Sequence, residues 1–341
     1  MQRVLTTLSH KEPDRVPFFL LLTMHGAREL GMTIREYFSK AENVVEAQMR
    51  LYYKYGHDCL FGFFFGPIEI MAWGGEVVFY DDGPPNSGEP FIKRAEDISS
   101  LKPPFIYESP QLRKVLKAIS LLNAKSAGEV PVLGVVMSPF SVPVMQMGFE
   151  TYIEILHFKP LYYEKLMEVN MTFCAAWANA QLEAGATAIC YFDPVSSPTI
   201  IPRELYLKTG FPVAVNTISR INGLTATHMA SGRALAIVDD LAKTGTGAVG
   251  VSADEDLADL KKACRGRLGV IGNLNGLEMT HWSRQQTEAA VREAISKAAS
   301  GGGFILSDNH GEIPFQVSDE VLEAVGQAVN KYGLYPQKQR N

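Results

Sequence analysis

The stretch PLYYEKLMEVNMTFCAAWANAQLEAGATAICYF, residues 160–192, joins the two patterns that decide the fold. Its first part, Pro160–Glu183, reads as a long helix, and Thr187–Phe192 (TAICYF) is a short, β-rich apolar run. The run is mostly continuous rather than alternating, which is typical of a parallel strand buried on both faces. A helix that leads into such a strand is the repeating unit of an α/β fold.

Similar apolar runs recur along the whole chain, with helical patterns such as Arg233–Thr244 and Thr287–Ser300 between them. The other runs are Val16–Leu22, Asp58–Phe65, Pro131–Met137, Leu224–His228, Gly247–Ser252, Leu268–Gly272 and Gly303–Leu306. Eight strands that alternate with helices predict a (β/α)8 TIM barrel, a single domain over residues 1–341 with an N-terminal extension. The alternative is an open doubly wound sheet, but the G-x-G-x-x-G turn that would favour it does not follow the first run.

The composition is that of an ordinary globular protein. The 341 residues include 32 Lys and Arg against 37 Asp and Glu, so the net charge is −5, and 46% of the residues are hydrophobic. That apolar content excludes disorder for the chain as a whole. The absence of a basic excess argues against a dedicated nucleic-acid binder.

The cysteines and the N-terminus bear on location. None of Cys59, Cys174, Cys190 and Cys264 forms a C-x-x-C pair, so each is interpreted as a small buried hydrophobic residue. The opening MQRVLTTLSHKEPDR has no apolar core of a secretory signal, and no apolar stretch approaches the ~20 residues of a membrane helix. We expect a cytoplasmic protein that does not contact a membrane.

Polar residues follow many of the predicted strands, at the end where the active sites of such barrels lie. Asp193 and His310 are candidates for acid–base catalysis, and His228 ends the fifth run. Asp193 could instead cap a turn, and His228 could be a hydrogen-bonded core residue. The further candidates for substrate binding at this end are His25, Asn273, Asn275, Asp308 and Asn309.

Several of these segments resemble the uroporphyrinogen decarboxylase superfamily. The resemblance rests on MQRVLTTLSHKEPDRVP, DPVSSPTIIPRELY, INGLTATHMASGR, LGVIGNLNG and ILSDNHGEIPFQVSDE, which together run nearly end to end. It implies one (β/α)8 barrel, and the nearer branch is that of the corrinoid-dependent methyltransferases. The decarboxylases grip the carboxylates of their tetrapyrrole with an arginine-rich N-terminal segment, whereas PFFLLLTMHGARELG here contains Arg28 alone.

The thiol-methylating members of this branch hold zinc through His-x-Cys and Gly-Cys-Gly motifs, because zinc turns a thiol into a thiolate nucleophile. The matching positions here are His228-Met229-Ala230 and Asn309-His310-Gly311, so both cysteines are replaced. The resemblance therefore implies no zinc. A site built from His228, His310 and Asp193 is the remaining alternative for a metal.

A methyl acceptor that needs no zinc must be nucleophilic without first losing a proton, as N5 of tetrahydrofolate is. The chain resembles the tetrahydrofolate-accepting members of the branch that work in glycine betaine demethylation. We expect it to move a methyl group from a methyl-Co(III) corrinoid protein to N5, giving 5-methyltetrahydrofolate and Co(I). Asp and Asn side chains match the pterin edge, and the available ones are Asp193, Asn216, Asn273, Asp308 and Asn309.

The corrinoid is expected on a partner protein, because the chain lacks the Asp-x-His-x-x-Gly signature of a cobalamin carrier. A homodimer is compatible with the sequence. Three alternatives stay open: a zinc-dependent methylcobamide:coenzyme M methyltransferase, a uroporphyrinogen decarboxylase, and an inactive barrel that binds the corrinoid protein or a folate as a regulator.

Overall fold

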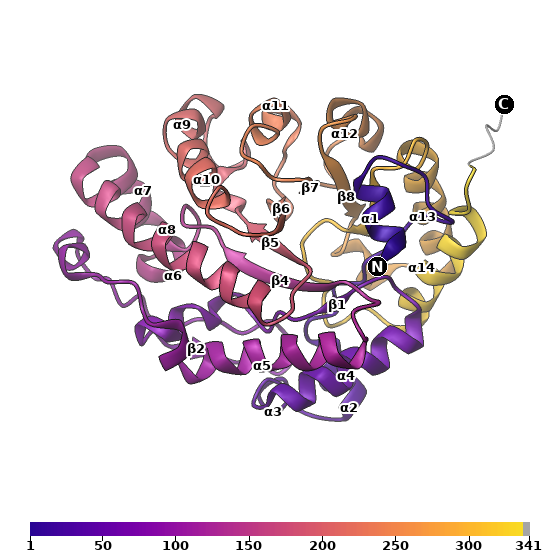
Figure 1. Ribbon diagram of the computed structural model, residues 1–341, viewed down its shortest axis with the longest axis horizontal. Helices are drawn as coiled ribbons and strands as arrows, with labels where there is room; N and C mark the ends of the chain where they lie inside the picture. Colours follow the sequence, from indigo (N-terminus) through magenta and orange to yellow (C-terminus); the bar gives the residue numbers. More distant parts are fainter. Residues whose placement is uncertain (337–341) are drawn as a thin grey trace.

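A computed structural model describes residues 1–336; residues 337–341, which the predicted domain includes, lie outside the described part. Seven parallel strands form one curled sheet in the order β1-β4-β5-β6-β7-β8-β9, with the helices around its outside (Figure 1). The strands are β1 (Leu60–Phe61), β4 (Val132–Met137), β5 (Ala188–Phe192), β6 (Leu224–His228), β7 (Ala248–Gly250), β8 (Gly269–Leu274) and β9 (Phe304–Asp308). This confirms the TIM-barrel-like α/β fold.

The helices alternate with the strands as the sequence predicts. Those before β4 are α1 (Gln2–Leu8), α2 (His25–Leu30), α3 (Ile34–Tyr37), α4 (Ala41–Tyr55) and α5 (Pro110–Lys125). Those after it are α6 (Pro143–Met147), α7 (Phe149–Phe158), α8 (Pro160–Glu183), α9 (Arg203–Lys208), α10 (Gly210–Ile218), α11 (Val238–Leu241), α12 (Leu257–Cys264), α13 (Arg284–Ala298) and α14 (Asp319–Tyr332). A small antiparallel pair, β2 (Val77–Val78) and β3 (Asn86–Ser87), lies in the loop after β1.

The barrel is closed by residues 16–22, which we call the closing segment. The Phe19 N–H donates to the Leu306 carbonyl (2.8 Å) on one side, and the Asp58 N–H donates to the Phe18 carbonyl (2.8 Å) on the other. The segment was predicted as the first regular strand, which is wrong: it pairs with β9 only through an isolated bridge at Phe18. Pro17 has no N–H to give to a ladder, which weakens regular pairing here.

A buried ion-pair cluster fixes the closing segment. The Asp58 carboxylate accepts hydrogen bonds from Arg15 Nη1 (2.7 Å) and from the Phe18 N–H (2.9 Å), and it also pairs with Arg3 of α1. The same carboxylate thus ties α1, the closing segment and β1 together. The predicted N-terminal extension, α1, lies at the start of the strands, where the Thr7 carbonyl accepts from the Gly303 N–H just before β9 (3.0 Å).

The long helix α8 has the predicted bounds, Pro160–Glu183. Pro160 suits a first helical turn, and Gln181 anchors the other end to β4 through Val135, whose N–H and carbonyl lie 3.0 and 2.8 Å from the Gln181 amide. The predicted helix 233–244 is only partly helical: Arg233 and Ala234 lie in a loop, Leu235–Ile237 forms a 3-10 helix, and the short α11 follows it. The Glu255 carboxylate accepts from the N–H groups of Ala234 and Leu235 at the start of this stretch.

Glu69 is a buried acidic residue that is not among the predicted site residues. One carboxyl oxygen accepts from the Met137 N–H (3.0 Å), and burial raises the pKa of Glu69 from 4.5 to about 8. The folded protein therefore holds a proton that the unfolded chain releases above pH 4.5, so this contribution to stability disappears as the pH rises through 8. Between pH 7 and pH 9 we expect a loss of about 1.4 kcal/mol in unfolding free energy.

Urea unfolding of the wild type and of Glu69→Gln at the two pH values measures this loss. The neutral amide mimics the protonated acid, so the variant should lack this part of the pH dependence. Glu164→Gln, at an exposed position on α8, is the matched control and should behave as the wild type. Equal pH dependence in Glu69→Gln and the wild type would contradict the prediction.

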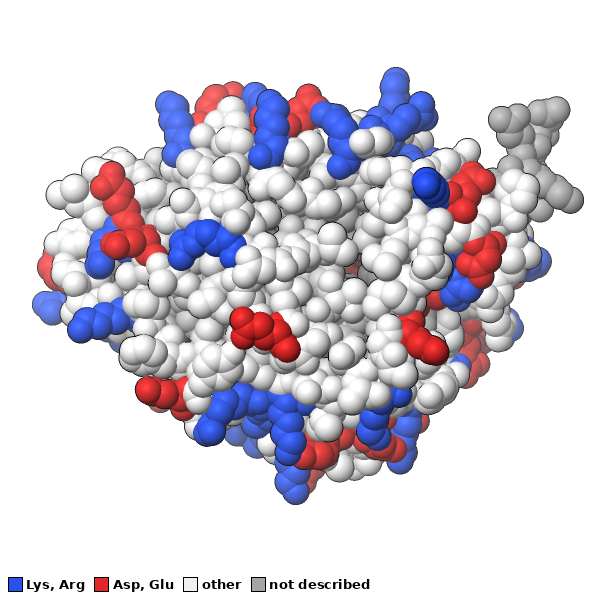
Figure 2. Space-filling model, viewed as in Figure 1, with Lys and Arg blue, Asp and Glu red and all other residues white. Residues whose placement is uncertain are grey.

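Charged side chains lie mainly along the edges of the face seen in Figure 2, with both signs interspersed and the middle mostly uncharged. That face presents no continuous basic stripe of the kind a nucleic-acid binder uses. Within residues 1–336, no helix is both long and apolar enough to cross a bilayer.

Candidate active site

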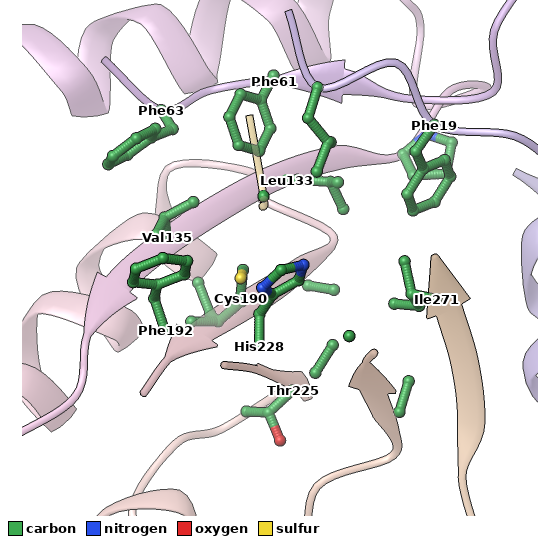
Figure 3. Close-up of a pocket in the computed structure, with 18 of the residues that line it drawn as sticks. Phe19, Phe61, Phe63, Leu133, Val135, Cys190, Phe192, Thr225, His228 and Ile271 are labelled. Carbon is green, nitrogen blue, oxygen red and sulfur yellow. The ribbon is translucent and has the colours of Figure 1, made fainter. Parts of the chain in front are cut away.

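A cavity of about 300 Å³ occupies the inside of the barrel (Figure 3). TIM barrels normally fill this space with layers of bulky side chains. Here several inward-facing positions of the middle strands carry small residues instead. They are Ala188 and Cys190 of β5, Ala226 of β6, and Ala248 and Gly250 of β7. The barrel is hollow because these side chains are too small to meet in its centre.

His228 projects into this cavity from the end of β6 (Figure 3). Its ring stacks on Phe192, with the centroids 5.8 Å apart, and a Cβ on Gly250 would lie 2.1 Å from its Cδ2. Burial lowers the pKa of His228 to about 4, so the ring is neutral at pH 7. Nδ1 accepts the Ala230 N–H (3.0 Å), which leaves the ring proton on Nε2.

His228 Nε2 is buried and has no hydrogen-bond partner within residues 1–336. Given the tautomer set by Ala230, this nitrogen is a donor. It is therefore free to bind an acceptor atom of a ligand in the cavity.

His310 lines the opening of the cavity and is the second imidazole of the site. Its Nδ1 lies 3.1 Å from the Ser231 hydroxyl, and burial lowers the pKa of His310. Asp308 shapes the turn that carries it, because its Oδ2 accepts the N–H groups of His310 (2.7 Å) and Gly311 (3.0 Å). The other oxygen of Asp308 is buried without a partner in the described residues, and burial raises its pKa to about 6.

Glu312 supplies the carboxyl group that lines the cavity. Its Oε2 accepts the hydroxyl of Thr23 at 2.6 Å, and burial raises the pKa of Glu312. The sequence analysis did not select this residue, although it stands two positions after His310 in NHGEIP. A polar residue so close to a strand end is the signal that could have found it.

Asp193 does not line the cavity, contrary to its predicted catalytic place. Its side chain is buried, and Oδ1 accepts the hydroxyls of Ser138 (2.6 Å) and Ser141 (2.8 Å). Burial raises the pKa of Asp193, and these hydroxyl hydrogen bonds oppose the shift. The carboxyl therefore joins the loops after β4 and β5.

Of the nine predicted site residues, His228 and His310 line the cavity. Asn309 accepts the Gly276 N–H, Asn273 donates to the Ser252 carbonyl (2.9 Å), and Asn275 accepts the Glu278 N–H. These amides hold the loops at the strand ends. Asn216 does not line the cavity: it is exposed on α10, where its Oδ1 accepts from Arg220 Nη1 (3.4 Å).

His25 begins α2, directly after the closing segment, and is almost fully buried. Neither of its ring nitrogens has a hydrogen-bond partner among the residues that the structure describes. Burial lowers the pKa of His25 to about 3, so the ring is neutral. It lies beside Phe315 rather than in the cavity.

The family model for uroporphyrinogen decarboxylase (URO-D) matches residues 1–332. The chain belongs to the uroporphyrinogen decarboxylase family. Its relatives within the family include the methylcobamide:CoM methyltransferase MtbA of Methanosarcina mazei, 26% identical over 70% of this chain and 69% of that protein. MtaA of Methanosarcina barkeri is 26% identical over 51% of each chain, so the match spans about half its length. The uroporphyrinogen decarboxylase of Magnetococcus marinus is 24% identical over 94% of each.

Solved structures of other proteins share the fold. A methyltransferase from Methanosarcina mazei superimposes with a TM-score of 0.86 at 21% identity, covering 97% of this chain and 98% of that one. A B12-independent methionine synthase from Shewanella reaches a TM-score of 0.53 at 14% identity. At these identities the likeness shows the barrel architecture alone.

The donor set does not match a zinc site built from His-x-Cys and Gly-Cys-Gly motifs. Ala230 has no ligand atom, and within residues 1–336 no group of three His, Cys, Asp or Glu side chains could hold a metal ion. His228 Nδ1 already accepts a backbone N–H. Neither Cys190 nor Cys264 stands at either of the two motif positions, 228–230 and 309–311.

Proposed function

We propose that this protein is a corrinoid-dependent methyltransferase that transfers the methyl group of a methyl-Co(III) corrinoid protein to N5 of tetrahydrofolate. The observation that carries the proposal is the pair of neutral imidazoles, His228 and His310, in a mouth that lacks the zinc–thiolate donors. Without such donors an acceptor must be nucleophilic in its neutral form, as N5 is. Family membership and the methylcobamide:CoM relatives support the methyltransferase class.

In this reaction His310 and Glu312 have separate roles. The N5 lone pair forms a bond to the methyl carbon, the cobalt–carbon electron pair stays on cobalt as Co(I), and the N5 proton must then leave. His310 receives that proton, since its imidazole is neutral and faces the cavity. Glu312 is the carboxylate available to the paired N–H donors of the pterin, whereas the carboxylates offered for this role by the sequence were Asp193 and Asp308.

Decarboxylation of a porphyrinogen is less well supported. The substrate of that reaction carries several carboxylates, which require cationic partners. Among the described residues, no Lys or Arg side chain lines the cavity, and Arg28 instead pairs with Asp319 and the Val317 carbonyl.

Titration calorimetry with tetrahydrofolate tests the acceptor. Glu312→Gln should raise the Kd by roughly 10- to 100-fold, because a hydrogen bond to a charged group contributes about 1.5–3 kcal/mol. Asn216→Ala, on the exposed face of α10, is the matched control and should leave the Kd unchanged. Wild-type affinity in Glu312→Gln, or no binding of tetrahydrofolate at all, would contradict the proposal.

Metal analysis tests the zinc-free mechanism. The purified protein should contain no stoichiometric zinc and should keep its methyltransferase activity in a chelator, because Ala230 cannot act as a ligand. The double substitution Ala230→Cys with His310→Cys restores the motif of the thiol-methylating relatives and should bind zinc. One tightly held zinc per wild-type chain, with activity lost on its removal, would refute the mechanism.

A further inference from the structure

The barrel cavity continues far below the mouth as an apolar channel. Its lining reaches from His310 and Gly311 at the opening to Val4, Leu5 and Leu8 of α1 at the opposite end of the strands. The walls between are mostly aromatic and aliphatic. The residues that Figure 3 labels there include Phe19, Phe61, Phe63, Leu133, Val135, Phe192 and Ile271.

The size and polarity of the channel define what it can hold. An apolar cavity of roughly 150 Å³ stays dry and binds benzene, so about 300 Å³ accommodates one or two aromatic rings. Water needs several polar partners to occupy such a space, and the wall offers few. The edge of a pterin, with its many donors and acceptors, would likewise leave most of them unpaired in the channel.

The lining also contains polar residues, among them Thr225, Thr227 and Glu312, and His228 offers a ring N–H donor at a defined point. His228 Nε2 carries the ring proton, is buried, and has no partner within residues 1–336. A buried donor of this kind gains a hydrogen bond when the ligand brings an acceptor oxygen. Charged ligands are disfavoured, because no Lys or Arg side chain lines the described wall and Glu312 stands at the opening.

We infer that the channel binds an uncharged aromatic molecule of one or two rings, whose carbonyl or ether oxygen accepts a hydrogen bond from His228 Nε2. The small residues Ala226 and Ala248 create the space for its rings, while Gly250 leaves room for the imidazole of His228. This inference stands apart from the methyl transfer proposed above, since it requires neither a folate nor a corrinoid.

The naphthalene ketone prodan is a suitable probe. It is uncharged and bicyclic, it carries one carbonyl acceptor, and its emission shifts to the blue in apolar surroundings. The full-length protein should bind one prodan per chain with a blue shift. Its parent amine without the propionyl group serves as the matched probe that lacks the acceptor.

Filling the channel should remove binding. Ala226→Leu with Ala248→Leu occupies the space of the rings and should abolish the blue shift, whereas Ala176→Leu on the exposed face of α8 should leave it intact. Circular dichroism checks that the double variant folds. If it does not fold, Ala248→Leu alone occupies less volume and should still weaken prodan binding.

His228→Phe separates the hydrogen bond from the apolar contact. It should weaken prodan by roughly 2- to 10-fold and leave the affinity of the parent amine unchanged. Absence of prodan binding to the wild type, or undiminished binding to the filled variants, would overturn the channel assignment. Equal losses for the two probes in His228→Phe would overturn the role of Nε2.

Discussion

Replacing His310 by Ala should lower kcat for methyl transfer to tetrahydrofolate by about 10²- to 10⁴-fold, the range typical of a general acid–base group. The imidazole lines the cavity and is neutral at pH 7, because burial lowers the pKa of His310. The N5 proton would then have no acceptor in the site. Steady-state kinetics over a range of pH measure the effect.

The pH profile distinguishes proton transfer from simple binding. In the wild type kcat should fall as the pH decreases through the lowered pKa of His310, because the protonated ring cannot accept a proton. His310→Ala should lose this limb of the profile. His281→Ala, at an exposed position before α13, is the control and should behave as the wild type. A raised KM with unchanged kcat in His310→Ala would assign the residue to binding alone.

Asp58→Ala should destabilise the protein by about 3–5 kcal/mol, the cost of leaving buried charges without their partner. The carboxylate joins Arg15, Arg3 and the Phe18 N–H, so its loss frees the closing segment from β1. Urea unfolding at pH 7 measures the change in free energy.

The matched control is Asp14→Ala. Asp14 also pairs with Arg3, but 64% of its side chain is exposed, and surface pairs contribute only about 0–1 kcal/mol. The difference between the two variants therefore isolates the buried part of the network. Equal destabilisation by Asp58→Ala and Asp14→Ala would show that the cluster does not hold the barrel closed.

The sequence predicted the positions of β4 to β9 well, because most of them are continuous apolar runs between turn signals, although β6 (LTATH) contains polar residues. The start of α13 was placed three residues late, since Ser283 and Gln286 form a polar capping box that the apolar pattern does not include. The closing segment has the composition of a strand. Its pairing depends on Pro17 and on Asp58, a residue distant in sequence.

The site was harder to predict. The position of a polar residue after a strand does not determine whether its side chain points into the barrel or into a loop. Asp193 and Asp308 follow or end predicted strands, yet both carboxyls turn into loops and bind hydroxyl or N–H groups there. Asn216 was chosen because its side chain is an amide. The neighbouring residues Val213, Ala214 and Thr217 form the buried face of α10, so Asn216 lies on the exposed face. The segments TAICYF and GAVG contain small residues that face the inside of the barrel. They indicate a channel only when the register between neighbouring strands is known, because the register decides which of these residues lie at the same level.

The most direct test of the proposed function is an acceptor assay with methylcobalamin or a methylated corrinoid protein, run with and without a chelator. Loss of the cobalt–methyl absorption should occur with tetrahydrofolate and not with coenzyme M, and 5-methyltetrahydrofolate should form in equal amount. His310→Ala should show little of either change. The proposed function would be contradicted if the corrinoid lost its methyl group only with coenzyme M as the acceptor and if the chelator abolished that reaction.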